Sequence, residues 1–130
     1  MRMRNRTTVR SSFAISGFDC DPSEITHALG IVPTRTSTEA PDRSGFKYWE
    51  FDQKEIDSVF VEEHVAKIIE RLANSSHTIM ESPIFKTKNV ELNIFVIAKV
   101  SENDIGVRMC LSPEISKYLS DHCINLVIDG

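Results

Sequence analysis

Long hydrophobic runs are missing from this 130-residue sequence, and their absence limits where the chain can work. No apolar stretch approaches the roughly 18 residues that a membrane-spanning helix needs. Residues 1–10 are basic, but Arg10, Ser11 and Ser12 interrupt the apolar segment that a secretory signal would place behind them. We therefore expect no membrane insertion and, by default, a cytoplasmic location.

Cysteine is scarce, and its spacing predicts neither disulfides nor a metal centre. Cys20, Cys110 and Cys123 make an odd number and contain no Cys-x-x-Cys pair, which argues against a disulfide framework. The histidines show no i, i+4 pair and no zinc-finger spacing relative to these cysteines. We expect three ordinary thiols, and neither a metal nor another cofactor.

Signatures of catalysis and of phosphate binding are also missing. The sequence has no glycine-rich cradle and no Walker pattern. A cysteine with His122 and an aspartate can be assembled only from scattered positions, without a local signature. Asp19 and Asp21 are close carboxylates, but a turn residue and a helix N-cap explain both. These absences favour a domain that is not an enzyme.

The charge is acidic overall but unevenly distributed. The formal net charge is −4, although residues 1–10 contain four arginines and no acid. When those four are taken from the 15 basic residues, 11 remain against 19 acidic ones, a balance of −8. An acidic body repels nucleic acid and suits a partner with a basic surface, so we do not expect a nucleic-acid partner. Residues 1–6 are candidates for a flexible basic arm.

Hydrophobic residues make up 41% of the chain, which supplies a core for one domain over residues 1–130. Period-two alternation predicts strands at 7–16, 46–51, 89–100, 105–111 and 124–128. Apolar positions at period 3.6 and capping residues predict helices that begin after Asp21, after Asp57 or Ser58, and after Ser112. The expected fold is α+β, with the order β-α-β-α-β-β-α-β. It is a largely antiparallel five-stranded sheet with three helices on one face.

A string of short motifs along the chain matches a known pattern. Its parts are Phe13-Ala14-Ile15-Ser16-Gly17, Asp19, Asp21-Pro22, Ile25-Thr26, Leu29-Gly30-Ile31, Pro33-Thr34, Trp49 and Leu111-Ser112-Pro113-Glu114. The string covers nearly the whole chain and resembles a bacterial domain family of unknown function, the one numbered 4279. The resemblance implies a small standalone bacterial domain. It brings no catalytic residues to this chain.

The sheet face away from the helices is the first candidate site. On that face, the alternating residues of the predicted strands include apolar side chains among charged ones, and such a patch usually marks an interaction surface. The candidate residues of this surface are Phe95, Ile97, Cys110, Arg108 and Trp49. We hypothesise that the chain binds another protein, as an immunity-like inhibitor of a basic toxin would, or binds itself as a homodimer. In the alternative, residues 79–85 fold over this face and it is part of the core.

The polar segment 34–45 is the second candidate site. It is near the upper length of an ordinary loop and offers hydroxyl and guanidinium groups that can bind an anion. The candidate residues are Thr34, Arg35, Thr36 and Arg43. The corresponding hypothesis is a small-ligand or anion-binding domain, and the simpler alternative is a solvated loop.

Overall fold

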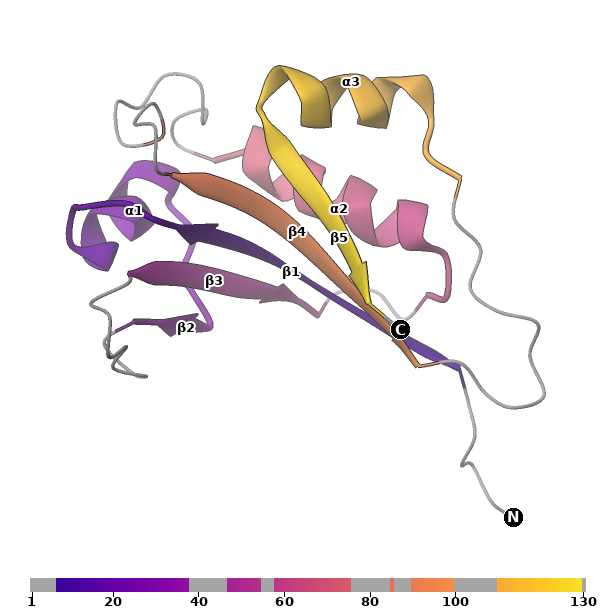
Figure 1. Ribbon diagram of the computed structural model, residues 1–130, viewed down its shortest axis with the longest axis horizontal. Coiled ribbons are helices and arrows are strands. Elements are labelled where there is room, and N and C mark those ends of the chain that lie inside the picture. Colours follow the sequence, from indigo (N-terminus) through magenta and orange to yellow (C-terminus); the bar gives the residue numbers. More distant parts are fainter. Residues whose placement is uncertain are drawn as a thin grey trace, which may run out of the picture.

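The computed structural model describes residues 7–37, 47–54, 58–75, 85, 90–99 and 110–129. These residues form a five-stranded sheet and three helices (Figure 1). The predicted α+β class is therefore confirmed. The strands are β1 (Thr8–Ser16), β2 (Arg35–Thr36), β3 (Tyr48–Gln53), β4 (Glu91–Lys99) and β5 (Ile124–Asp129). The helices are α1 (Pro22–Leu29), α2 (Val61–Ala73) and α3 (Pro113–Asp121).

The strand order is β2-β3-β1-β4-β5, and the sheet is mixed rather than largely antiparallel. The strand β5 lies parallel to β4, because the connection between them contains α3 and returns the chain in the same direction. The other three pairings are antiparallel. The predicted helices and strands that fall within the described residues occur in the predicted order along the chain.

One predicted strand is not among the five, and one observed strand was not predicted. Of the expected strand 105–111, residues 105–109 lie outside the described residues, and Cys110 and Leu111 are not in a strand. The strand β2 instead lies within the segment 34–45 that was predicted to be a loop. Two residues are too few to show a period-two pattern, so only their pairing with β3 identifies them as a strand.

Capping chemistry fixes two of the three helix starts where the sequence predicted them. Asp21 forms a capping box with Glu24 before α1, and the Ser112 side chain accepts a hydrogen bond from the backbone of Ile115 in α3. The start of α2 differs from the prediction. Its N-cap is Phe60, while the Ser58 hydroxyl accepts a hydrogen bond from the Phe60 backbone just outside the helix. Asp57 lies outside the described residues.

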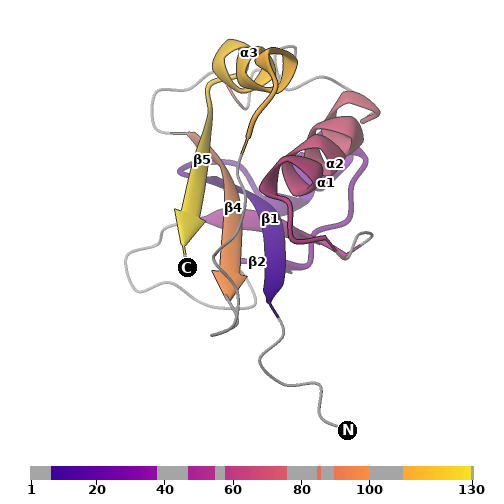
Figure 2. The same cartoon turned by 90° about the vertical axis from the view of Figure 1, so that its right-hand side faces the viewer.

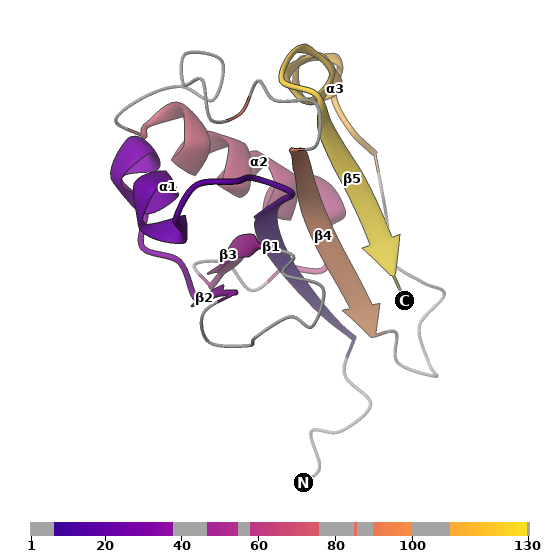
Figure 3. The same cartoon turned by 60° about the vertical axis from the view of Figure 1, so that its left-hand side comes forward.

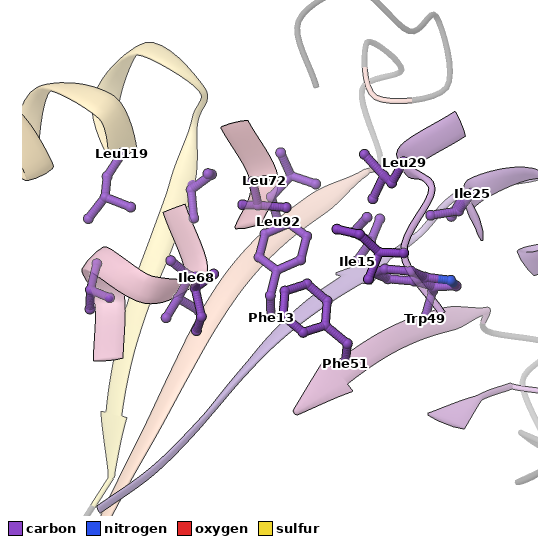
Figure 4. Close-up of a cluster of buried hydrophobic side chains, with 14 of the residues drawn as sticks. Phe13, Ile15, Ile25, Leu29, Trp49, Phe51, Ile68, Leu72, Leu92 and Leu119 are labelled. Carbon is purple, nitrogen blue, oxygen red and sulfur yellow. The ribbon is translucent and has the colours of Figure 1, made fainter. Parts of the chain in front are cut away.

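The helices pack on one side of the sheet (Figures 2 and 3). The helix α2 crosses β1, β3 and β4, α1 covers β3, and α3 packs against β5 and α2. Their apolar faces bury a core against the sheet, which Figure 4 shows in close-up. Burial of this apolar area is the main source of the domain's stability.

Trp49 belongs to this core, so its predicted place on the opposite face is wrong. Its side chain is fully buried, and its indole Nε1–H donates a hydrogen bond to Thr26 Oγ1 at 3.0 Å. The register explains the orientation, because Trp49 pairs with Ile15 and Phe51 pairs with Phe13 in β1. Residues paired across a sheet share one face, so the aromatic rings of Trp49 and Phe51 lie with Phe13 and Ile15 (Figure 4).

Candidate functional site

We call the side of the sheet opposite the helices the open face. No helix of the described ranges packs on it (Figure 2). Successive side chains of a strand point to opposite sides, so the residues that alternate with the core residues form this face. They include Arg35 of β2, Glu50 and Asp52 of β3, Arg10 and Ser12 of β1, Phe95 and Ile97 of β4, and Val127 and Asp129 of β5.

The open face is hollowed at its centre. One depression of about 360 Å³ is lined by Arg10, Ser11, Ser12, Arg35, Glu50, Asp52, Gln53, Lys54, Phe95 and Ile97. A neighbouring depression of about 440 Å³ shares Ser12, Glu50, Phe95 and Ile97 with it and continues over Val127 and Asp129. We call the first depression the central hollow. The two together form a concave surface that runs across the sheet from β3 to β5.

An ion network forms one wall of the central hollow. The Arg35 guanidinium donates from Nη1 to Glu50 Oε1 at 2.6 Å and to Asp52 Oδ1 at 3.0 Å, and from Nη2 to Asp52 Oδ2 at 2.8 Å. The Ser12 hydroxyl donates to the second oxygen of Glu50 at 2.7 Å. All four carboxylate oxygens of Glu50 and Asp52 therefore already accept hydrogen bonds from within the domain.

The same network holds Arg35 in place. Its hydrogen bonds to Asp52 and Glu50 raise the pKa of Arg35 above its ordinary value, against the smaller effect of partial burial. Pairing of Arg35 with Glu50 in the β2–β3 ladder sets the backbone from which the side chain reaches both acids. Arg35 is thus a fixed, charge-compensated part of the wall, and its two terminal nitrogens are engaged.

The described residues of the predicted anion-binding loop, Thr34, Arg35 and Thr36, make separate contacts. Thr34 Oγ1 accepts a hydrogen bond from the Asp52 backbone at 2.8 Å, and Thr36 pairs with Trp49. Arg35 is held in the ion network, and Arg43 lies outside the described residues. The loop hypothesis stays a prediction, and the described part of the segment acts as an edge strand of the sheet.

Two residues of the predicted interaction surface lie where the sequence placed them. Phe95 and Ile97 are on the open face and line both depressions. Cys110 is exposed, but it lies beside Phe60 and the first turn of α2, around a separate depression of about 300 Å³. Arg108 lies outside the described residues. Of the segment 79–85, only Phe85 is described, and it packs against the core.

Sequence reasoning missed the acidic and serine side chains of the central hollow. The alternation Tyr48, Glu50, Asp52 continues past Phe51, where the predicted strand ended, and this polar phase was the available signal. Arg35 could not be connected to these acids in advance. Its partners lie 15 and 17 positions away along the chain, and only the β2–β3 pairing brings them together.

One buried histidine lies on the helix side, not in the central hollow. His64 of α2 is 1% exposed. A carbonyl can only accept, so the Nε2–H of His64 donates to the Ser58 carbonyl at 2.8 Å. The other ring nitrogen, Nδ1, is hydrogen-bonded to the Ser11 hydroxyl at 2.7 Å. Both ring nitrogens are satisfied, as in a structural histidine.

The part of the chain that the structure describes contains no group of three or more histidine, cysteine or acidic side chains that could hold a metal ion. No helix in these ranges is long and apolar enough to cross a membrane.

A family model, the Domain of unknown function (DUF4279), matches residues 7–130. The chain belongs to this family. This match confirms the resemblance seen in the sequence, and it includes every residue that the structure describes. Comparisons with curated proteins and with solved structures gave no match. The description of DUF4279 names no activity, and a fold alone does not define one, so any function must follow from the open face itself.

Proposed function

We propose that this domain is a non-enzymatic protein-interaction domain whose open face binds a segment of another protein. The observation that carries the proposal is apolar surface next to the central hollow. Ile97 is 54% exposed and Val127 is 39% exposed, and Val127 pairs with Phe95 on the same face. Apolar side chains gathered at a concave, charge-rimmed surface are typical of a binding site rather than of free surface.

The shape of the open face favours a different protein over a second copy. A twofold dimer through this face would place one concave surface against another, because the same patch is used on both sides. Two facing depressions would leave unfilled space, whereas stable interfaces pack about as densely as protein interiors. A convex segment that inserts an apolar side chain beside Phe95 and Ile97 fits the concave surface better.

The charge of the central hollow favours an acidic segment. Its lining contains Arg10, Arg35 and Lys54 against Glu50 and Asp52, which is a balance of +1. The acidity of the whole sequence predicted a partner with a basic surface, but the positive charge of the central hollow suits an acidic partner. Complementary charge at the rim of an interface guides association and fixes orientation.

A displayed library of random peptides, selected against the purified domain, tests this proposal. We expect the selected peptides to share an aspartate or glutamate beside a large apolar residue. We also expect Ile97→Lys to abolish their binding while the variant keeps the wild-type melting temperature. Peptides that bind Ile97→Lys as well as the wild type would place the binding surface elsewhere. A dimer in native mass spectrometry that Ile97→Lys turns into a folded monomer would show self-association instead.

A small ligand is the second candidate occupant, and the size of the central hollow supports it. About 360 Å³ lies within the range of small-molecule sites, roughly 300–1,000 Å³. A thermal-shift screen against nucleotides and phosphorylated metabolites tests this alternative. A bacterial origin and a cytoplasmic location stay predictions from the sequence.

A further inference from the structure

Two cations, Arg10 and Lys54, line the central hollow. Ser11 of β1 pairs with Gln53 at the end of β3, Arg10 precedes Ser11, and Lys54 follows Gln53 just beyond the strand. Both side chains are exposed, and both line the hollow. Two like charges that line one hollow repel each other, and an anion bound between them relieves this repulsion.

Glu50 and Asp52, the two acids that line the central hollow with this pair, are already engaged. Both oxygens of Asp52 accept from Arg35, and the oxygens of Glu50 accept from Arg35 and Ser12. Within the described ranges, neither Arg10 nor Lys54 has a hydrogen-bond or ion-pair partner. Arg10 and Lys54 therefore contribute two positive charges to the lining, while Arg35, Glu50 and Asp52 together carry one negative charge, which leaves the balance of +1.

The third neighbour in this row is apolar. Arg10 pairs with Ile97 in β4, so the two cations are followed along the row by an exposed aliphatic side chain. Phe95 lines the same hollow two positions along β4. A ligand that contacts this row needs an anionic group next to an apolar group.

We infer that Arg10 and Lys54 form an anion-binding position that receives a carboxylate whose neighbouring apolar group packs on Phe95 and Ile97. The inference rests on the proposed function and names the chemistry of its anchor, an aspartate or glutamate side chain of the bound segment. A carboxylate fits better than a phosphate. One negative charge neutralises the +1 lining, whereas a dianion would bring excess charge against Glu50 and Asp52.

Nuclear magnetic resonance titration with 3-phenylpropionate tests the inference. This probe joins one carboxylate to an aromatic ring. Its neutral amide and inorganic phosphate are the matched probes. We expect 3-phenylpropionate to shift the amide resonances of β1 and β4 and to bind more tightly than either control. The double variant Arg10→Gln with Lys54→Gln should weaken its binding about tenfold, since each exposed ion pair contributes little and the two act together.

Lys117→Gln is the control variant, because it removes one positive charge on α3, outside the hollow. We expect it to leave binding of the probe unchanged. The single variants Arg10→Gln and Lys54→Gln, each with a smaller loss, cover the case in which the double variant does not fold. Three results would overturn the inference. The acid and its amide could bind equally well, or the Gln variants could keep the wild-type affinity for 3-phenylpropionate. Millimolar 3-phenylpropionate could also leave the amide resonances of β1 and β4 unshifted.

The proposed function can stand when this inference fails. If the selected peptides lose binding to Ile97→Lys but bind the Arg10→Gln, Lys54→Gln variant unchanged, the open face is the binding surface and the carboxylate anchor is wrong. If the probe binds through Arg10 and Lys54 while no selected peptide depends on Ile97, the anion position is real and the protein-interaction proposal fails.

Discussion

The two faces of the sheet are built from the same strands, but one packs against the helices and the other does not. On the helix side, Phe13, Ile15 and Trp49 are fully buried in a continuous core. On the open face, the alternate residues form an ion network, a hollow and a set of exposed apolar side chains. The difference teaches that the alternation of each strand separates the core from the surface that we propose as the binding site, so a substitution should affect stability or the proposed binding according to its phase.

The largest expected effect uses two isoleucines of one strand. Ile94 is fully buried on the helix side, and Ile97 is 54% exposed on the open face. Ile94→Ala should lower the free energy of unfolding by about 2–5 kcal/mol through lost burial and a cavity. Ile97→Ala should change it by only about 0.5 kcal/mol. Urea denaturation of both variants measures this, and equal losses would mean that the open face is part of the core.

Two neighbouring serines give the next comparison. The Ser11 hydroxyl is hydrogen-bonded to buried His64 on the helix side, and the Ser12 hydroxyl donates to partly buried Glu50 on the open face. Ser11→Ala should cost about 1–3 kcal/mol, because Nδ1 of His64 then lacks a partner in a dry interior. Ser12→Ala should cost less, because Glu50 keeps Arg35 and can also bind water. Thermal unfolding of the two variants gives the order. A larger loss for Ser12→Ala would show that water does not replace the lost hydrogen bond to Glu50 in the hollow.

A smaller effect is expected from the ion pairs. Arg35 binds two carboxylates, whereas Lys117 binds Asp121 alone at a more exposed position on α3. Arg35→Gln should lower the free energy of unfolding by about 1 kcal/mol, after allowance for solvent screening, and Lys117→Gln by a few tenths. Added salt should reduce both differences. If Arg35→Gln has no effect on denaturation, the network does not order the wall of the hollow.

The smallest expected effect concerns the Asp21 cap of α1. Hydrogen bonds from the Ser23 backbone and side chain lower the pKa of Asp21 in the folded state. A carboxyl group whose pKa is lower in the folded than in the unfolded state stabilises the fold at pH values above its unfolded pKa. This stability is lost as the pH falls through the folded pKa. Asp21→Ala should therefore lower the melting temperature at pH 7, with a difference from the wild type that shrinks in acid. A difference that stays constant down to pH 2 contradicts the charged cap.

Local signals in the sequence were enough for part of the fold. Asp21-Pro22 and Ser112-Pro113 start helices through contacts within three residues, and both were predicted correctly. The alternation of β4 also showed Phe95 and Ile97 on one phase. The phase of β3 could not be settled this way. Trp49 and Tyr48 are both aromatic, and only the register with β1 decides which of them faces the helices.

The candidate site was predictable only in outline, because its parts are far apart in the sequence. Ile97 was recognised because an apolar residue stood among charged ones. The hollow itself depends on β2, whose two residues carry no pattern, and on Arg35 reaching across to β3. Arg10 and Lys54 likewise line the same hollow only because β1 pairs with β3. Long-range pairing, rather than local propensity, creates the site.

One binding measurement tests the central claim, that the open face binds and the helix side stabilises. It compares Ile97→Lys with Val32→Lys, which changes a 76% exposed valine outside the open face. Affinity for a display-selected peptide is measured by calorimetry, and each variant's melting temperature is checked. We predict that Ile97→Lys keeps its melting temperature but loses at least about tenfold in affinity, because a charge is forced into an apolar contact. Val32→Lys should keep both. Equal affinity of the two variants would contradict the account.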